Sequence, residues 1–321
     1  MSKKILITGG GGFIGHHFVQ YVLEMTSWHI VVLYRNNTKN IPKSDRVKCI
    51  KVDLSQKIDL DVGKIDYVVH MASETYVDDS LKNCISFVRS NVLGTANLLE
   101  WLKKNHLKTK VCVFSSDEVM GPAPQGIYFK ENDLRKPSNP YAATKAGAEL
   151  LAYSFAHSFN MPIFIIRCMN VLGEGESFKK FIPKTFKSIK EGKKVILHGT
   201  SLDNVASRHW IYAKDVADAV LFLLKEASPK EVYHIAGEER DVYSLAKMIY
   251  FSVKGQEMPI DAVEFVDFHN ARPGHDKRYS LSNEKLLKMG WKSQWSLNSC
   301  IENIVKDLEI NYKQEDGSHY K

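Results

Sequence analysis

The chain has 321 residues and a mass of 36.5 kDa, enough for a large buried core in one α/β unit or in two lobes. With 44% hydrophobic and 25% charged residues, its composition excludes disordered, collagenous and low-complexity proteins. The net charge of +7 is scattered among acidic residues, which favours a mixed solvated surface over a nucleic-acid-binding patch. A small positive excess also suits an anionic, phosphate-bearing substrate.

Neither the chain start nor the cysteines indicate export or metal binding. The apolar stretch in MSKKILITGG is too short for a signal-peptide core, and no uninterrupted apolar run could span a bilayer. We therefore expect a cytoplasmic protein with no membrane partner. The cysteines are Cys49, Cys84, Cys112, Cys168 and Cys300. Because their number is odd and no CxxC or Cys/His spacing occurs, we expect buried free thiols and no metal site.

In chain order, short apolar runs alternate with longer amphipathic segments. The runs predict strands at 5–7, 29–33, 47–52, 67–70, 111–114 and 163–166, and the segments predict helices that include 16–25, 91–104 and 142–159. After residue 170 the pattern loosens, with predicted helices at 179–191 and 215–225 and strands at 195–198 and 232–235. This alternation predicts an α/β fold, a Rossmann-type doubly wound parallel sheet with a smaller C-terminal α/β lobe. We assign residues 1–172 with about 209–235 to the first lobe, and 173–208 with 236–321 to the second.

A glycine-rich turn follows the first predicted strand and opens a helix. Gly9, Gly12 and Gly15 lie at GxxGxxG spacing within Thr8–Gly15. Glycine lets the backbone approach a pyrophosphate, and the helix N-terminus offers free N–H groups. The strand–turn–helix context predicts a dinucleotide site.

The choice between NAD and NADP is indicated by the end of the second strand. NAD-binding folds place a carboxylate there to bind the ribose 2′-hydroxyl, but this chain reads Leu33-Tyr-Arg-Asn36. Arg35 could pair with a 2′-phosphate, which favours NADP over NAD; the alternative is that Arg35 stacks on the adenine. Asp53, which closes the third strand, could reach the adenine or merely cap the strand end.

A catalytic set is predicted at the start of the helix 142–159 and the end of the strand 111–114. Tyr141 and Lys145 lie four residues apart, so one helical face carries both. A nearby ammonium and the positive nicotinamide would favour the phenolate of Tyr141, a base near neutral pH. Ser116 completes a Ser/Tyr/Lys set. Asp117 and Glu118 follow at once, and loss of water needs two such proton-transfer groups.

At this point the chain resembles a known family, the extended short-chain dehydrogenases/reductases, and within it the nucleotide-sugar 4,6-dehydratases, of which dTDP-glucose 4,6-dehydratase is the best known. The likeness runs from Lys4 to about Tyr312. It rests on the glycine-rich turn, Tyr141–Lys145, and the segments 70–80, 91–95, 115–118, 167–170 and 272–279. The segment Ser115-Ser-Asp-Glu118 distinguishes the 4,6-dehydratases from related 4-epimerases, which keep the Tyr/Lys pair but lack paired carboxylates.

The resemblance implies an internal hydride transfer from C4 to C6 of a nucleotide-linked hexose. Tyr141, with Ser116 and Lys145, would take the C4 hydroxyl proton, Glu118 the C5 proton, and Asp117 would protonate the departing C6 hydroxyl. The implied cofactor-binding residues are Gly9, Gly12, Phe13, Ile14, Gly15, Arg35, Asn36, Asp53, Leu54, Met71, Ala72, Ser73, Asn91, Tyr141 and Lys145. The implied substrate-binding residues of the nucleotide-sugar-binding lobe and its rim are Ser73, Glu74, Thr75, Asn170, Lys184, Arg208, Arg272 and His275. The family also implies a homodimer.

Several departures leave the substrate open. Met120 and Thr75-Tyr76 replace residues usual near the sugar, and Tyr34 replaces the NAD-type aspartate. The nucleotide is dTDP, UDP, GDP or CDP, and the hexose is glucose or N-acetylglucosamine. The alternatives are a 4-epimerase, a 5,6-dehydratase, or a non-catalytic dinucleotide-binding regulator.

Overall fold

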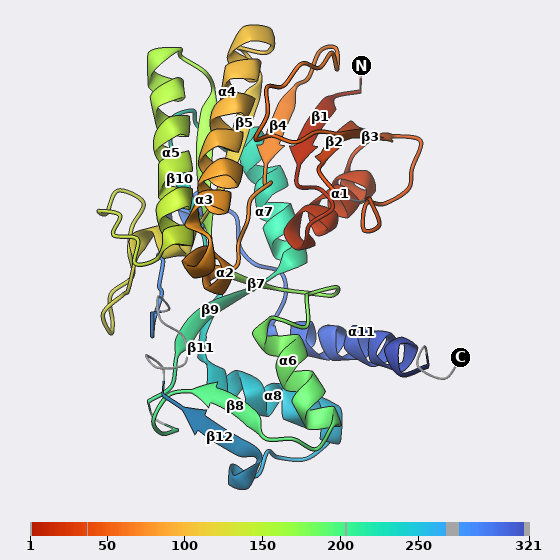
Figure 1. The fold of residues 1–321 in the computed structure, drawn as a ribbon, viewed down its shortest axis with the longest axis vertical. Helices are drawn as coiled ribbons and strands as arrows, with labels where there is room; N and C mark the ends of the chain where they lie inside the picture. The colour runs from red at the N-terminus through yellow and green to blue at the C-terminus, as the bar shows by residue number, and fades with distance from the viewer. Residues whose placement is uncertain (1, 37, 203, 268–275, 318–321) are drawn as a thin grey trace.

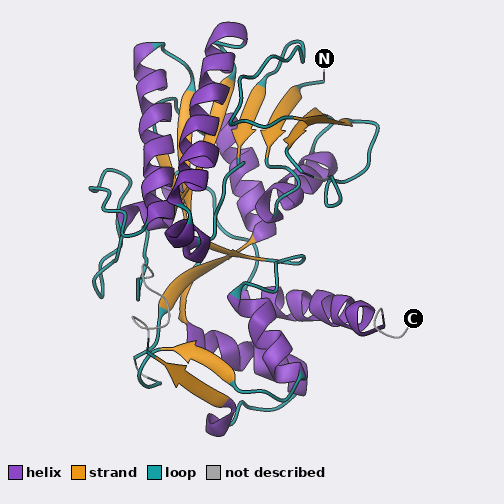
Figure 2. Ribbon diagram, in the orientation of Figure 1, coloured by secondary structure: helices purple, strands orange, loops and turns teal. Residues whose placement is uncertain are grey.

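The computed structural model describes residues 2–36, 38–202, 204–267 and 276–317. Its larger lobe is built on a parallel seven-stranded sheet in the order β10-β6-β5-β4-β1-β2-β3 (Figures 1 and 2). The strands are β1 (Lys4–Thr8), β2 (His29–Tyr34), β3 (Val47–Lys51), β4 (Tyr67–His70), β5 (Lys110–Ser116), β6 (Ile163–Cys168) and β10 (Val232–Ile235).

Helices cover both faces of this sheet, as alternation of its side chains requires. On β1, Ile5 and Ile7 pack in the core shared with α1 (Phe13–Met25) and α7 (Ala213–Glu226). Leu6 between them packs in the core shared with α4 (Gly94–Asn105) and α5 (Pro140–Ser158). All three side chains are fully buried, and a parallel sheet is stable only when both of its faces are covered.

The strand order reverses beside β1, which pairs with β2 on one side and β4 on the other. In a doubly wound sheet, ligands bind in the crevice beyond the carboxyl ends of the strands at such a reversal. Thr8 ends β1 there, His70 ends β4, and Ser116 ends β5 on the next strand along. This edge of the sheet therefore holds the candidate site.

A smaller lobe lies below this edge in Figure 1. It contains a three-stranded sheet, β11-β9-β7, and a two-stranded sheet, β12-β8. Its elements are β7 (Asn170–Leu172), α6 (Phe181–Lys190), β8 (Val195–His198), β9 (Ser207–Tyr212), β11 (Glu238–Asp241), α8 (Val242–Lys254), β12 (Val263–Val266) and α11 (Leu297–Gly317). They share a separate core that includes Phe186, Leu197 and Ile301.

The chain crosses between the lobes more than once. After the small lobe it returns to the large one, where Leu286 of α10 (Glu284–Lys288) and Trp291 are buried in the core beside α7. The indole Nε1 of Trp291 donates to Asp218 Oδ2 of α7 at 2.7 Å. The remaining short elements are α2 (Val77–Lys82), α3 (Cys84–Phe87), the π-helical η1 (Val88–Leu93), and the 3₁₀ turns η2 (Asp117–Met120) and η3 (Ile260–Ala262).

The predicted fold class is confirmed, with two local corrections. β3 is an edge strand paired only with β2, so its side chains are mostly exposed rather than buried on both faces. For this reason Cys49 on β3 is exposed, as is Cys84 at the start of α3, whereas the other three cysteines are buried as expected. All five thiols are free. Within the described ranges, no helix combines the length and the apolar character needed to cross a membrane.

Candidate active site

The turn after β1 has a shape that only glycine can adopt. Gly9 has a φ of +74°, and a Cβ atom there would lie 2.7 Å from the backbone nitrogen of Ala72. A Cβ on Gly15 would lie 2.2 Å from the carbonyl oxygen of Gly9. Glycine at these positions lets the turn fold back against α1 and β4.

The N-terminus of α1 fits an anionic group. Gly12 is its N-cap, and within the described chain no side chain satisfies the N–H groups of its first turn. The first turn also carries no acidic residue. Free N–H groups and the positive end of the helix dipole are the usual binding site for a pyrophosphate, so the residues present fit a dinucleotide.

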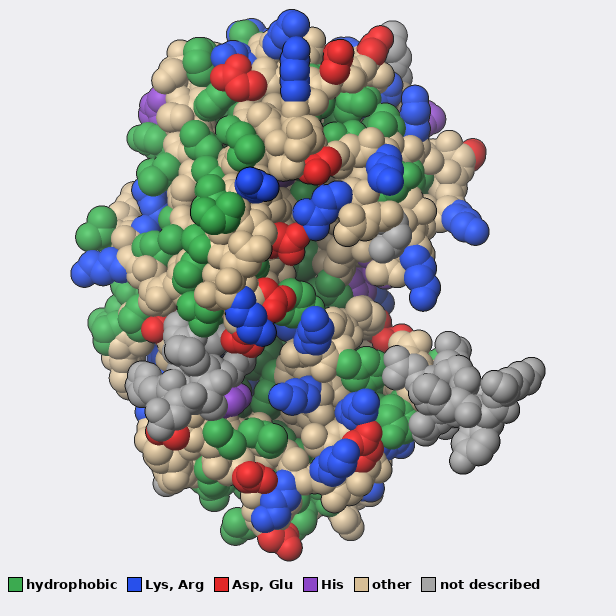
Figure 3. Space-filling view, viewed as in Figure 1, with side chains coloured by type: hydrophobic (Ala, Val, Ile, Leu, Met, Phe, Trp, Pro, Cys, Tyr) green, Lys and Arg blue, Asp and Glu red, His purple; other side chains and the backbone are tan. Residues whose placement is uncertain are grey.

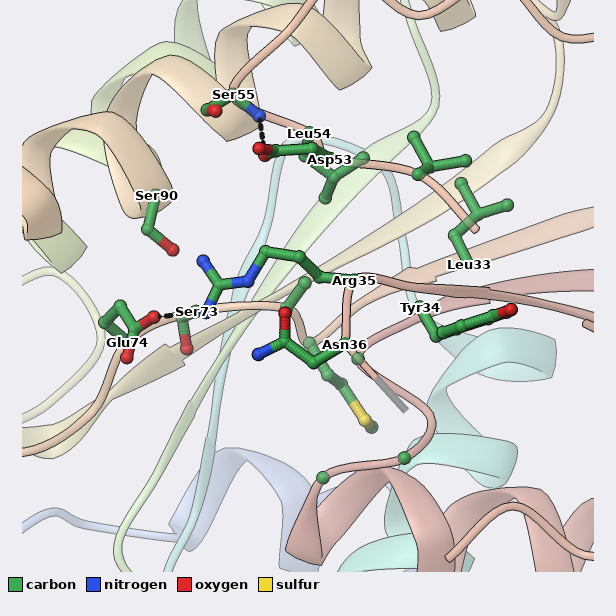
Figure 4. A pocket seen from close by; sticks show the side chains of 16 residues that line it. Leu33, Tyr34, Arg35, Asn36, Asp53, Leu54, Ser55, Ser73, Glu74 and Ser90 are labelled. Carbon is green, nitrogen blue, oxygen red and sulfur yellow. Dashed lines mark hydrogen bonds and ion pairs between the residues drawn. The ribbon is translucent and has the colours of Figure 1, made fainter. Parts of the chain in front are cut away.

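An open pocket of about 300 Å³ lies in front of this turn (Figure 4). Most of the predicted cofactor-binding residues line it, namely Gly9, Gly12, Arg35, Asn36, Asp53, Leu54, Met71, Ala72 and Ser73. Glu74, which the family resemblance assigned to the substrate, also lines this pocket, as do Gly11, Leu33, Tyr34, Val52, Ser55 and Ser90. Phe13, Ile14 and Gly15 lie behind the turn in α1.

Two charged side chains meet across the pocket. Arg35, just after β2, donates from Nη2 to Glu74 Oε1 at 2.6 Å, and Figure 4 shows the two reaching toward each other. Asp53 lies further along, where its Oδ1 accepts from the backbone of Ser55 at 2.9 Å. Hydrogen bonds from Ser55 and the nearby charge of Arg35 lower the pKa of Asp53, which keeps its carboxylate ionised.

Asn91 is placed behind this pocket and does not line it. Its side chain accepts from the backbone N–H of Glu74 at 2.8 Å and donates to the carbonyl of Glu74 at 3.0 Å. The same amide donates to Thr144 Oγ1 on α5 at 3.0 Å. Asn91, predicted to touch the cofactor, is thus used in positioning the chain after β4 relative to the catalytic helix.

The start of α5 presents the predicted Tyr/Lys pair. Asn139 caps this helix by accepting from Ala142 N at 2.8 Å, and Pro140 opens it. Tyr141 and Lys145 are both buried, on the side that faces the end of β5. Lys145 Nζ donates to the carbonyl oxygen of Phe114 on β5 at 2.6 Å. This bond fixes the helix against the strand that carries the other catalytic groups.

The end of β5 brings together the predicted serine and carboxylates. Ser116 Oγ donates to Asp117 Oδ1 at 2.9 Å and is also hydrogen-bonded to Tyr141. Glu118 Oε2 accepts from Asn139 Nδ2 at 2.8 Å and from the hydroxyl of Tyr279 at 3.4 Å. Asp117 Oδ2 is buried without a protein partner, so it is available to a ligand.

Burial changes the protonation of both carboxyl groups. Burial, followed by the charge of Glu118, raises the pKa of Asp117 to about 7. Burial also raises the pKa of Glu118, against the hydrogen bond from Asn139 and the charge of Arg208. One carboxyl group can therefore hold a proton near neutral pH while its neighbour is ionised, the condition for an acid and a base side by side.

In the protein without a bound dinucleotide, Lys145 does not favour the phenolate of Tyr141 as the sequence suggested. Burial and the charge of Glu118 raise the pKa of Tyr141, and the ammonium of Lys145 is engaged with Phe114. Burial lowers the pKa of Lys145 to about 8. The phenolate of Tyr141 therefore needs a further positive charge, and the predicted set leaves this to the nicotinamide.

The predicted substrate residues fall into three groups. The first group comprises Asn170 and Arg208. Asn170 begins β7 with a buried Nδ2 that has no protein partner. The positive charge of Arg208 acts to lower the pKa of both Asp117 and Glu118. Ser73, Glu74 and Thr75 follow β4, with Thr75 exposed, and Lys184 is exposed on α6. Arg272 and His275 lie outside the described residues. Figure 3 shows a hollow between the lobes, edged by basic and acidic side chains.

Three residues around Glu118 were not predicted. Asn139 and Tyr279 both contact Glu118, and the charge of Lys180 acts on it from the start of α6. Asn139 stands directly before Pro140, which marks it as a helix cap in the sequence. Tyr279 closes the quoted segment 272–279, but nothing in the sequence indicates which groups it contacts.

One edge of the sheet combines a dinucleotide crevice with a Ser/Tyr/Lys set and paired carboxylates. This combination defines a nicotinamide-dependent enzyme of the short-chain dehydrogenase/reductase type. The model of the NAD dependent epimerase/dehydratase family matches residues 5–236, and the chain belongs to this family. The human dTDP-D-glucose 4,6-dehydratase is 32% identical over 324 residues, which cover 97% of this chain and 91% of that protein.

Solved structures agree with this assignment. A dTDP-glucose 4,6-dehydratase from Streptomyces venezuelae with NAD bound is 27% identical, with a TM-score of 0.86 over 97% of this chain and 98% of that one. A UDP-N-acetylglucosamine 4-epimerase from Methanobrevibacter ruminantium is 26% identical, with a TM-score of 0.84 over 97% and 99% of the two chains. The resemblance to 4,6-dehydratases drawn from the sequence is thereby confirmed.

Proposed function

We propose that this chain is an NAD(P)-dependent nucleotide-sugar 4,6-dehydratase, a hydro-lyase that forms a 4-keto-6-deoxy sugar. The observation that carries the proposal is the pair of buried Asp117 and half-buried Glu118 beside Tyr141 and Ser116. A 4-epimerase needs one base at C4, which Tyr141 supplies. A dehydratase needs in addition a base for C5–H and an acid for the leaving hydroxyl.

The residues divide the reaction as follows. Tyr141 accepts the C4 hydroxyl proton, with Ser116 hydrogen-bonded to it and Lys145 beside it on α5. Glu118 removes the C5 proton, which the new C4 ketone has made acidic. Asp117, protonated near neutral pH, gives its proton to the C6 hydroxyl, which leaves as water. Glu118 then returns its proton to C5. The proton that Tyr141 took replaces, through solvent, the one that Asp117 gave, so the product has lost one water and the protein groups are restored.

The nicotinamide, when bound, supplies the hydride chemistry by accepting the hydride of C4 and returning it to C6. The finer choice between NAD and NADP belongs to the same proposal. Arg35, with no carboxylate at the end of β2, supports NADP, as the sequence predicts. The carboxylate of Glu74, which is paired with Arg35 at 2.6 Å, acts against NADP.

The two lobes then have separate tasks. The larger lobe binds the dinucleotide, and the smaller lobe binds the nucleotide sugar. The unpartnered Nδ2 of Asn170 supports a diphosphate site between the lobes, with the guanidinium of Arg208, whose Nη1 and Nη2 donate to the carbonyls of residues 207, 276 and 277, supplying positive charge. A cytoplasmic location and a homodimer complete the proposal.

A substrate panel tests the activity. Purified protein, with no cofactor added, is incubated separately with dTDP-glucose, UDP-glucose, UDP-N-acetylglucosamine, GDP-mannose, GDP-N-acetylglucosamine and CDP-glucose. The masses of the products are measured by mass spectrometry. We expect loss of one water from one of these substrates. Tyr141→Phe abolishes the loss and Glu118→Gln slows it strongly, by about 10²-fold or more as is typical for a proton-transfer group.

A matched control is available on the surface. Glu100 is an exposed glutamate of α4, so Glu100→Gln should leave turnover unchanged. Inversion of the configuration at C4 without loss of water would show an epimerase instead. Loss of water without return of hydride to C6 would show a 5,6-dehydratase. Bound dinucleotide with no reaction on any sugar would show a non-catalytic binder.

A further inference from the structure

A carboxylate stands in the dinucleotide pocket although the end of β2 carries none. Glu74 comes from the segment after β4, 39 residues beyond Arg35, and its Oε1 lies 2.6 Å from Arg35 Nη2. Both residues line the pocket in front of the glycine-rich turn, together with Asp53. The arginine that would read a 2′-phosphate is therefore already paired.

The position of Glu74 is set by the fold around its backbone. Asn91 is 1% exposed and clamps both the N–H and the carbonyl of Glu74, at 2.8 and 3.0 Å. A third bond ties Asn91 to Thr144 on α5, so η1 and α5 together fix where the chain after β4 lies. The side chain of Glu74 is left to extend into the pocket toward Arg35, as Figure 4 shows.

We infer that Glu74 is a specificity-determining residue for the dinucleotide, and that it disfavours NADP by occupying Arg35 and by facing the 2′-phosphate with its own charge. The inference rests on the proposed function only in that the pocket binds NAD or NADP. It assigns to a residue after β4 the task that the end of β2 performs in NAD-binding folds.

The charges of the pocket explain the direction of the effect. The side chains of Arg35 and Glu74 are 51% and 35% exposed, and an ion pair in such a position contributes little to stability. A 2′-phosphate can therefore displace the carboxylate from Arg35, but Glu74 then lies beside a group of charge about −2. A ribose 2′-hydroxyl leaves the pair intact and can donate to the carboxylate.

Direct binding measurements test this without any turnover. The full chain, freed of any dinucleotide that co-purifies, is titrated by calorimetry with NAD+, NADP+, 5′-AMP and adenosine 2′,5′-bisphosphate. The variants are Glu74→Gln, Arg35→Ala and their combination. Glu100→Gln is the matched control, because Glu100 forms an ion pair of the same 2.6 Å length on the surface of α4, outside this pocket.

We expect Glu74→Gln to shift the ratio of affinities toward NADP+ by about tenfold, as removal of a like charge at close range implies. The ratio for adenosine 2′,5′-bisphosphate over 5′-AMP should shift alike, and the shift should shrink when Arg35 is also replaced. The control should keep the wild-type ratio. An unchanged ratio in Glu74→Gln, or a shift toward NAD+, would overturn the inference. If neither dinucleotide binds the wild-type chain, the proposed function itself is wrong.

Discussion

The side chain of Asp117 shows how its surroundings decide the chemistry of a single residue. In water an aspartate is ionised at neutral pH, with a pKa of about 3.9. At the end of β5 it is 6% exposed and adjoins a second carboxyl group, and its pKa rises to about 7. The fold thus keeps this carboxyl group protonated near neutral pH, so it can act as an acid, whereas in water it would be a carboxylate.

The first prediction is that kcat/KM falls as the pH rises through about 7. Asp117 acts in its protonated form, and its raised pKa places the loss of that proton near pH 7. On the acidic side the rate should fall where Glu118 gains a proton, above the range usual for a glutamate because its pKa is also raised. The two limbs belong to the coupled pair. Rates of water loss measured from pH 5 to 9 check this, and a flat profile between pH 6 and 9 would contradict it.

The second prediction concerns stability. Folded Asp117 keeps a proton that the unfolded chain loses near pH 4, so a rise in pH from about 4 to 7 favours unfolding. Asp117→Asn removes this penalty and should raise the free energy of unfolding at pH 8 by up to about 4 kcal/mol, while abolishing water loss. At pH 4 the two proteins should be nearly equal. Denaturant titrations at both pH values measure the difference.

Asp59→Asn serves as the control for that experiment. Asp59 is an exposed carboxyl group, so its replacement should change stability little at either pH. A variant Asp117→Asn that is destabilised equally at pH 4 and pH 8 would mean that the carboxyl group is not held protonated by the fold.

Individual site residues were predictable where chemistry and spacing are local. Tyr141 and Lys145 share one helix face, and Ser116, Asp117 and Glu118 are consecutive, so the motif identifies them together. Contacts between distant segments were not predictable. The Arg35–Glu74 pair joins residues 39 apart and the Tyr279–Glu118 bond joins residues 161 apart, and no periodicity encodes either contact.

At the scale of elements, the start of α5 combines a structural and a chemical task. Asn139 caps the helix with its side-chain oxygen and donates to Glu118 with its nitrogen. The cap stabilises the helix that carries Tyr141 and Lys145. The donated bond favours the ionised form of Glu118, the form in which it acts as a base.

The third prediction separates these two tasks. Asn139→Ala should lower the free energy of unfolding by about 1 kcal/mol through loss of the cap, and should also lower kcat. Asn139→Ser keeps a good N-cap but is too short to reach Glu118, so stability should be retained while kcat falls and the acidic limb of the pH profile moves to higher pH. Thermal unfolding and pH–rate profiles measured on both variants check this. Equal kcat for Asn139→Ser and the wild type would show that the bond to Glu118 is without consequence.

Elements were predictable from local pattern, and their partners only in part. The apolar runs predicted the strands of the large sheet because strands buried on both faces are apolar throughout. The small sheets were harder to predict: β7 and β11 are three and four residues long and join β9 through long-range pairs. The exposure of β3 follows from its place at the sheet edge, which is a property of the topology.

At the scale of the whole molecule, the lobes are joined by polar contacts around one loop. His17 of α1 contacts the carbonyl of Glu174 at 2.9 Å, and the hydroxyl of Tyr212 donates to the Glu174 carboxylate at 2.5 Å. The backbone N–H of Gly175 donates to Asp307 of α11 at 3.1 Å. The loop thus links α1 of one lobe to β9 and α11 of the other. The sequence alternation predicted a second lobe but not how it is attached.

The last prediction is that two copies associate through the face formed by α3, η1 and α5. Ile85, Val88, Leu150 and Tyr153 are exposed hydrophobic side chains on these elements, with exposed fractions of 63%, 39%, 52% and 50%. Figures 1 and 3 show this face toward the viewer, with hydrophobic atoms among polar ones. Exposed hydrophobic side chains on neighbouring elements are typical of a protein–protein contact, and the family resemblance implies a dimer.

The double variant Leu150→Glu/Tyr153→Glu places two charges on that face and should convert a dimer to a monomer, because burying unpaired charges in an interface is unfavourable. Light scattering coupled to size-exclusion chromatography measures the mass, and Phe251→Glu on α8, exposed at 60% in the other lobe, is the control. The monomer should bind dinucleotide as the wild type does, since the pocket residues come from one chain. A wild-type chain that elutes as a monomer, or a double variant that stays dimeric, would contradict the assignment of this face. Because α5 also carries Tyr141 and Lys145, a lower kcat in the monomer with unchanged dinucleotide affinity would show that the contact steadies the catalytic helix.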